Sequence, residues 1–96
     1  MSEFDLLKMQ RVIALRKQNP TESYTSKLFT DKKGATNKIC EKIGEETSEV
    51  ILAAKDNQGL VEEMADLWYF CTALLTEKGI NVQDVIKELE RRNKNG

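Results

Sequence analysis

The sequence predicts an all-α protein, a bundle of four to five helices that is completed by dimerisation. Apolar residues recur at intervals of three and four, and no segment shows the two-residue alternation of a half-buried strand. The single proline and most of the five glycines lie between these periodic segments. The 96 residues, 40% hydrophobic and 32% charged, fit one folded domain, residues 1–96. A chain this short buries little surface alone, which favours an oligomer.

The first predicted helix spans about residues 4–19, with Leu6, Met9 and Ile13 on one side, and Pro20 fixes its end. A polar connector, residues 21–35, follows it. This connector is long for a structureless loop between short helices, which indicates a functional role.

The second predicted helix spans about residues 36–57. Its apolar stripe consists of Ile39, Ile43, Val50 and Ala54, and Asn57, Gln58 and Gly59 stop it. Gly44 in its interior costs about 1 kcal/mol relative to alanine. We therefore expect a neighbouring helix to pack close to the backbone at Gly44.

The third predicted helix spans about residues 60–78 and has a wide apolar arc, which predicts two packing surfaces and supports a dimer. Gly79 is expected to adopt the left-handed conformation after this helix. Asn81 and Asp84 resemble a capping pair for a fourth helix. The expected buried stripe of that helix is Val82, Val85, Ile86 and Leu89.

Composition and charge exclude several classes of function. The net charge of −1 provides no overall field for nucleic acid or an anionic membrane. The N-terminus lacks a signal-peptide pattern and no apolar run is long enough to span a membrane, so we expect a cytoplasmic protein. Cys40 and Cys71 lie in apolar helical patterns and are expected to be buried. Without histidine, carboxylates, lysines and hydroxyls must carry the chemistry.

Two predicted helices each carry an acidic pair at a spacing of three residues. Glu46 falls within the apolar stripe of the second helix and Glu49 falls at its border. Glu63 borders the stripe of the third helix, and Asp66 lies one turn along. Four carboxylates gathered near a core need a cation, and an oxygen-only ligand set favours Mg²⁺. The alternative is a solvated acidic face with structural ion pairs.

Charged and aromatic residues close to these pairs are candidates for catalysis and substrate binding. Glu45 is a spare carboxylate, and Lys38 and Lys42 lie on the same helix flank, where they form ion pairs or bind phosphate. Lys27 in the connector is a further phosphate ligand candidate. Tyr24 is either a core residue or a base-stacking group.

Three segments carry a resemblance to a known family: SYTSKL from Ser23 to Leu28, KIGEETSEVILAAK from Lys42 to Lys55, and EEMADLWY from Glu62 to Tyr69. The sequence resembles the phosphoribosyl-ATP pyrophosphohydrolases over roughly residues 20–92. The wider superfamily is the all-α, MazG-like nucleotide pyrophosphohydrolases. Its pattern of ExxE followed by ExxD is met here by Glu46, Glu49, Glu63 and Asp66. Phe70 and Trp68 depart from the usual residues of the ADLxYH stretch.

The resemblance implies hydrolysis of phosphoribosyl-ATP to phosphoribosyl-AMP and pyrophosphate, the second step of histidine biosynthesis. It also implies Mg²⁺ and a homodimer whose helices build each active site together. In this interpretation Glu46, Glu49, Glu63 and Asp66 hold the metal, and Glu45 and Lys42 act in catalysis. Tyr24, Lys27 and Lys38 then bind the substrate. Two alternatives remain: another nucleoside triphosphate as substrate, or a non-enzymatic helical dimerisation module.

Overall fold

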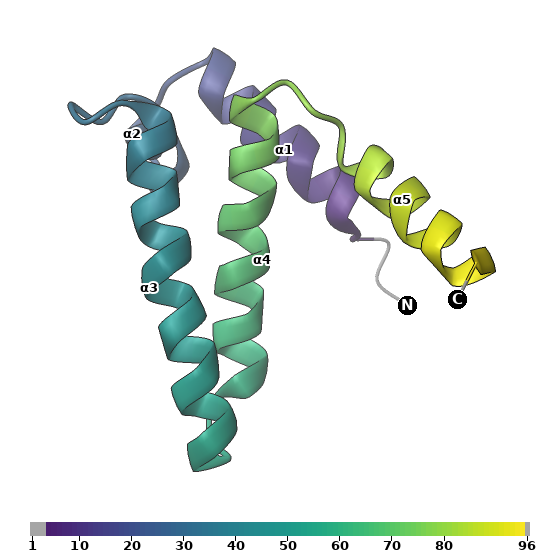
Figure 1. Cartoon of the computed structure of the whole chain (residues 1–96). Helices are drawn as coiled ribbons and strands as arrows, with labels where there is room; N and C mark the ends of the chain where they lie inside the picture. Colours follow the sequence, from purple (N-terminus) through teal and green to yellow (C-terminus); the bar gives the residue numbers. More distant parts are fainter. Residues whose placement is uncertain (1–3, 96) are drawn as a thin grey trace.

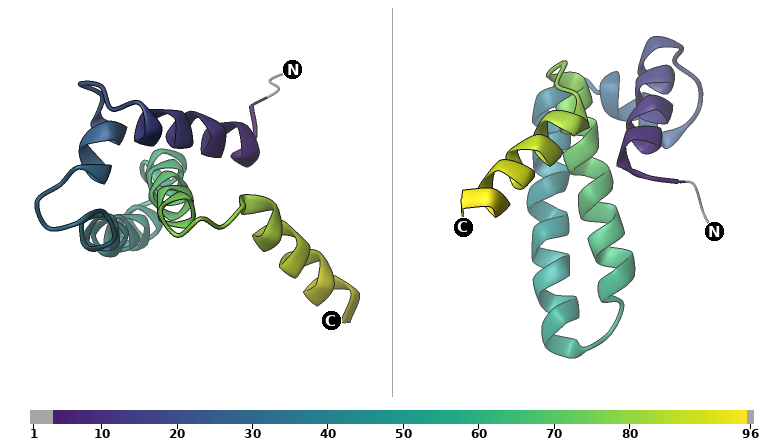
Figure 2. Two further views of the ribbon diagram at one scale, coloured as in Figure 1. Left: turned by 90° about the horizontal axis from the view of Figure 1, so that it is seen from above. Right: turned by 90° about the vertical axis from the view of Figure 1, so that its right-hand side faces the viewer.

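The computed structural model describes residues 4–95, which form five α-helices and no strand. The helices are α1 Leu6–Gln18, α2 Tyr24–Phe29, α3 Ala35–Asp56, α4 Leu60–Glu77 and α5 Val82–Asn95. α3 and α4 form a long antiparallel hairpin (Figure 1). Seen from above, α1 crosses one side of α4 and α5 projects away from the hairpin (Figure 2). The prediction of an all-α fold is confirmed.

Local signals in the sequence explain where the helices begin and end. The Asp5 side chain accepts a hydrogen bond from the Lys8 amide at 2.8 Å and caps α1. Ser23 caps α2 by accepting from the Ser26 amide, so the predicted connector contains a short helix of its own. Asn57 (φ 56°) and Gly79 (φ 70°) take the left-handed conformation after α3 and α4. The expectation for Gly79 is confirmed.

The core lies where α1, α2, α3 and α4 meet. Its buried side chains are Ile13, Leu28, Ile39, Phe70 and Ala73. Leu28 is only 1% exposed, so α2 contributes to the core although it has six residues. On α3 the buried alanine is Ala53, whereas the predicted stripe contained the exposed Ala54.

Gln10 of α1 anchors the turn between α4 and α5. Its side chain donates to the Ile80 carbonyl at 2.8 Å and accepts from the Val82 amide, also at 2.8 Å. This clamp buries Val82, but Val85 and Leu89 remain 41% and 56% exposed. Ile86 is half-buried, so the expectation of a buried stripe on α5 holds only for Val82, because α5 projects beyond the other helices (Figure 2).

Cys40, Cys71 and Gly44 also differ from expectation. Both cysteines are exposed rather than buried. Among the described residues, no atom beyond the local helix lies within 4 Å of the position that a Cβ would take at Gly44. These residues lie on faces of the hairpin that the other described helices leave uncovered. A helical pattern shows that a residue lies on an apolar flank but not whether its own chain covers that flank.

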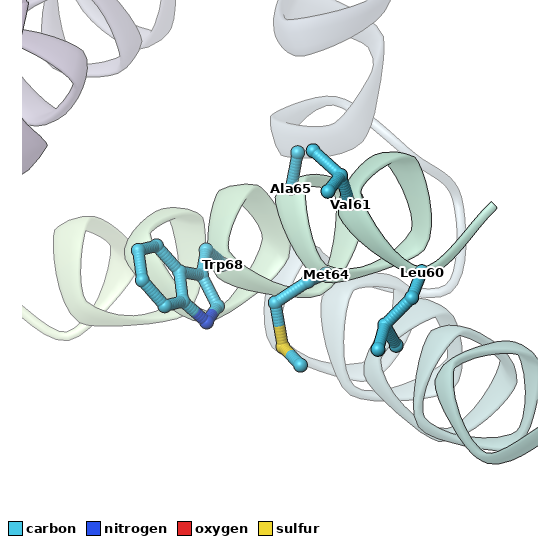
Figure 3. Close-up of a pocket in the computed structure, with 5 residues that line it drawn as sticks. All are labelled: Leu60, Val61, Met64, Ala65 and Trp68. Carbon is cyan, nitrogen blue, oxygen red and sulfur yellow. The ribbon is translucent and has the colours of Figure 1, made fainter. Parts of the chain in front are cut away.

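An uncovered apolar surface runs along α4 and continues onto α5. Trp68 is 54% exposed and borders three apolar hollows. Figure 3 shows the first hollow, lined by Leu60, Val61, Met64, Ala65 and Trp68 of α4. Another hollow lies between Trp68, Cys71 and Leu75 of α4 and the apolar side of α5. Within residues 4–95 no helix has the length and hydropathy needed to cross a membrane.

Candidate functional site

Three of the four predicted metal ligands lie together between α3 and α4. One carboxylate oxygen from each of Glu46, Glu63 and Asp66 lies within 4.8 Å of the others. We call these three residues the acidic trio. Glu63 and Asp66 are one turn apart on α4, so both face the neighbouring helix that carries Glu46. The antiparallel hairpin thus brings together residues that lie far apart in the sequence.

The environment of Glu46 disfavours its charge. Partial burial raises the pKa of the Glu46 carboxyl above its usual value, and the negative charges of Asp66 and Glu63 raise it further. Lys42 acts in the opposite direction on the same pKa. A bound cation would remove the repulsion within the trio. The oxygen-only donor set fits Mg²⁺, which binds through few carboxylates and retains water ligands.

Glu49 lies outside the acidic trio. It lies one helical turn beyond Glu46 on α3 and lines a polar hollow of about 240 Å³ together with Glu63, Asp56 and Gln58. Asp56 was not singled out in the sequence, although it follows Glu49 by seven residues and therefore lies on the same helix face. Glu49 adds negative charge beside the trio and contributes to the raised pKa of Glu46.

The two predicted catalytic residues are paired with each other. Lys42 Nζ donates to Glu45 Oε2 at 2.9 Å, which is an i, i+3 ion pair on α3. Glu45 is exposed and Lys42 is half-buried. The hydrogen bond to Glu45 raises the pKa of the Lys42 ammonium, so this cation is maintained beside the acidic trio. Lys42 Nζ also lies 5.8 Å from the centre of the Phe70 ring.

The predicted substrate-binding lysines occupy different places. Lys38 lies 3.7 Å from Glu41, which also accepts a hydrogen bond from Lys33 at 2.9 Å. Glu41 was not singled out in the sequence, and its spacing of three residues from Lys38 was the available signal. Lys27 is exposed on α2, next to the buried Leu28. The predicted substrate-binding lysines therefore lie on two different helices, α3 and α2.

Tyr24 lies at the start of α2, close to the hairpin. Its side chain is 53% exposed, and its ring meets the edge of Phe70 with centroids 6.2 Å apart. Partial burial raises the pKa of the Tyr24 hydroxyl, and the charges of Glu46 and Glu45 add to this effect while Lys42 opposes it. Tyr24 is therefore not a core residue. It offers an exposed aromatic surface near Lys42 and Glu46.

Two further polar residues connect α2 to α4 and were not predicted. The Thr25 hydroxyl, which is buried, forms a hydrogen bond with the Tyr69 hydroxyl. Tyr69 packs edge-on against Phe70, with ring centroids 5.1 Å apart. The spacing of three residues between Asp66 and Tyr69 was the one sequence signal that linked Tyr69 to the acidic face of α4.

Comparisons with known proteins identify the family of this chain. The sequence profile of the phosphoribosyl-ATP pyrophosphohydrolase family matches residues 6–93. The chain is 54% identical over 79 residues to the phosphoribosyl-ATP pyrophosphatase of Methanosphaera stadtmanae, covering 81% of this chain and 83% of that protein. It is 48% identical over 93 residues to the corresponding protein of Bacillus mycoides, covering 93% and 84% respectively.

A third relative contains a segment similar to this chain as one part of a longer protein. The Histidine biosynthesis bifunctional protein HisIE of Gloeobacter violaceus is 44% identical over 85 residues, which cover 88% of this chain and 38% of that protein. The family profile covers all of the predicted site residues, from Tyr24 to Asp66. The chain therefore belongs to the phosphoribosyl-ATP pyrophosphohydrolase family.

Proposed function

We propose that this protein is a cytoplasmic enzyme that hydrolyses phosphoribosyl-ATP to phosphoribosyl-AMP and pyrophosphate in histidine biosynthesis. The observation that carries the proposal is the acidic trio, whose oxygens lie within 4.8 Å of one another inside the segment that matches the family profile. The names of the curated relatives supply the substrate class. Water attacks phosphorus at the linkage between the α and β phosphates, and pyrophosphate leaves.

Glu46, Glu63 and Asp66 would hold Mg²⁺, and Glu49, which shares a polar hollow with Glu63, would join them or bind a second ion. The ion, when bound, neutralises phosphate charge and lowers the pKa of a coordinated water. The carboxylates also orient the triphosphate, because their shared negative charge excludes phosphate oxygens from the trio unless a cation lies between them.

The remaining charged residues act on the phosphates and on the attacking water. Lys42 supplies a fixed cation beside the trio, and Lys38 and Lys27 add positive charge on α3 and α2. Glu45 is the candidate general base, and it accepts the proton of the attacking water once Lys42 has exchanged its carboxylate partner for a phosphate oxygen. Tyr24 provides an exposed ring on which the adenine base stacks.

The active form in this proposal is a homodimer, and the uncovered apolar surface of α4 and α5 supports it. Val61 is 80% exposed and Trp68 is 54% exposed, although both belong to the apolar arc of α4. At 1.5 Å per residue, the 18 residues of α4 extend this apolar surface over about 27 Å.

Phosphorus NMR of phosphoribosyl-ATP with the enzyme and Mg²⁺ tests the proposed reaction. We expect signals of pyrophosphate and a phosphomonoester, and their absence without Mg²⁺. A panel of nucleoside triphosphates, including damaged ones, serves as the comparison, because faster turnover of one of these would establish the alternative substrate. No turnover of any nucleotide, together with no Mg²⁺ binding by calorimetry, would favour the non-enzymatic module.

A further inference from the structure

α2 needs outside contacts to hold its place. A helix of six residues is too short to be stable by itself in water. Three of its side chains, Thr25, Ser26 and Leu28, are at most 3% exposed, and they face the rest of the protein. Leu28 provides a hydrophobic contact that does not depend on direction, whereas the two hydroxyl groups impose a specific orientation.

The two hydroxyl groups anchor α2 to two different helices. Ser26 Oγ donates to the Arg16 carbonyl at 2.9 Å and accepts from the Thr21 amide at 3.0 Å, which fixes α2 to the end of α1. The Thr25 hydroxyl bonds with the Tyr69 hydroxyl and fixes α2 to α4. The bond from Thr25 is therefore a polar contact that sets α2 relative to the hairpin.

Tyr69 lies on α4, the helix that carries Glu63 and Asp66 of the acidic trio. It follows Asp66 by three residues, so both side chains project from the same helix face. The Phe70 ring contacts Tyr69 on one side and Tyr24 on the other, at centroid distances of 5.1 and 6.2 Å. The Thr25–Tyr69 bond and this aromatic contact together connect the first turn of α2 to the helix that bears Asp66.

We propose that the Thr25–Tyr69 hydrogen bond positions Tyr24 relative to the acidic trio, so that the base and the phosphates of a bound nucleotide are held at once. Thr25 and Tyr69 are then positioning residues that act through Tyr24 and need not touch the substrate. This inference rests on the proposed nucleotide hydrolysis and assigns a role to the SYTSKL segment. Loss of the hydrogen bond should weaken the stacking of the nucleotide base on Tyr24 and leave the metal ligands in place.

Steady-state kinetics with phosphoribosyl-ATP test this role. Thr25→Val keeps the shape of the side chain and removes its hydroxyl. We expect KM to rise about five- to tenfold, with kcat within about twofold and the Mg²⁺ concentration for half-maximal rate unchanged. Thr25→Ser, which keeps the hydroxyl, should restore KM. The matched control is Thr72→Val, because Thr72 is as buried as Thr25 but bonds to the Trp68 carbonyl of its own helix.

A double-mutant cycle identifies the bond itself as the cause. Tyr69→Phe removes the same hydrogen bond from the other partner and should raise KM by a similar factor. The variant with both Thr25→Val and Tyr69→Phe should have the same KM as either single variant, because each single change already removes the hydrogen bond. Multiplying effects would show that the two residues act independently and would overturn the proposal.

Two readouts without turnover complete the test. Calorimetry with α,β-methylene-ATP should show the same five- to tenfold loss of affinity in Thr25→Val. Amide hydrogen exchange should accelerate in α2 while α3 and α4 keep their protection. A variant that melts earlier but keeps its KM and its nucleotide affinity would show a purely structural bond.

The outcomes also separate this inference from the proposed function. A wild-type protein that binds α,β-methylene-ATP in a Thr25-dependent manner, but does not hydrolyse phosphoribosyl-ATP, would refute the substrate and support the positioning role. Hydrolysis of phosphoribosyl-ATP with an unchanged KM in Thr25→Val would support the proposed substrate and refute the positioning role. A wild-type protein that neither binds nor hydrolyses a nucleotide would overturn both.

Discussion

Replacing Glu46 with glutamine tests whether charge repulsion in the acidic trio lowers the stability of the metal-free protein while the trio is needed for activity. Glu46 is half-buried between α3 and α4, and its oxygen lies within 4.8 Å of oxygens from Glu63 and Asp66. Glutamine keeps the size of the side chain and removes its charge. We expect the metal-free variant to be more stable than the wild type and nearly inactive.

The expected gain in stability follows from Coulomb repulsion. Two unit charges 4.8 Å apart repel by about 0.9 kcal/mol at a dielectric constant of about 80, and by more where burial lowers that constant. Two such neighbours give about 1 to 2 kcal/mol, some of which salt screens. For a domain of this size this raises Tm by at least about 4 °C. The lost ligand should lower kcat about a hundredfold or more.

Thermal melts in chelator, at one fixed protein concentration, are to be compared with initial rates at saturating Mg²⁺. The control is Glu88→Gln on α5, because Glu88 has attractive neighbours, Arg91 and Arg92, instead of repulsive ones. This control should show no gain in stability and near-normal rates. If Glu46→Gln lost stability and kept its activity, the carboxylate would be part of a structural ion pair and our electrostatic reasoning would be wrong.

The difference between wild type and Glu46→Gln should also depend on pH. The folded state raises the pKa of Glu46, so the folded wild type binds more protons than the unfolded chain between the ordinary and the raised value. The metal-free wild type therefore loses stability from this group as pH rises through that window. The variant should therefore be no more stable than the wild type at low pH, and its gain in free energy of unfolding should grow as pH rises. Urea melts of both proteins at a series of pH values would measure this difference.

Four further predictions concern the metal, the dimer and two single residues. Chelation should abolish turnover without loss of helical circular dichroism, and cooperative unfolding on chelation would show a structural metal instead. Trp68→Glu should convert a dimer to a monomer in light scattering, and a wild-type monomer at micromolar concentration would refute the dimer. Glu49→Gln should lower activity by orders of magnitude without loss of metal-free stability; near-normal rates would exclude this residue from the site. Gly44→Ala should stabilise the monomer by roughly 0.5 to 1 kcal/mol, because open space surrounds its Cβ position.

The helices could be predicted closely because their signals are local. Pro20, the stop at residues 57–59 and Gly79 each end a helix through backbone preferences that act within one turn. The helix within the connector was missed because α2 is short and its stability comes from Leu28 and Ser26, which contact distant parts of the chain.

The candidate site was predictable in part. Helical periodicity placed Glu46 on an apolar stripe and placed Glu63 and Asp66 on one face of α4, which is a property of spacing alone. The distances among the three, and the position of Glu49 outside the trio, depend on how α3 and α4 pack. Thr25 and Tyr69 are 44 residues apart in the sequence, so no local pattern predicts their hydrogen bond.

The sequence by itself determined the fold class, the positions of the long helices and the set of carboxylates from which a metal site could be built. These follow from periodicity, turn residues and the absence of histidine, all of which can be read without knowing how the helices pack. Only the tertiary structure decided which apolar flanks are covered, leaving Cys71 and Trp68 exposed, and which polar groups meet across helices. Both depend on the relative placement of whole helices, because burial and hydrogen bonding between distant residues are properties of packing rather than of local sequence.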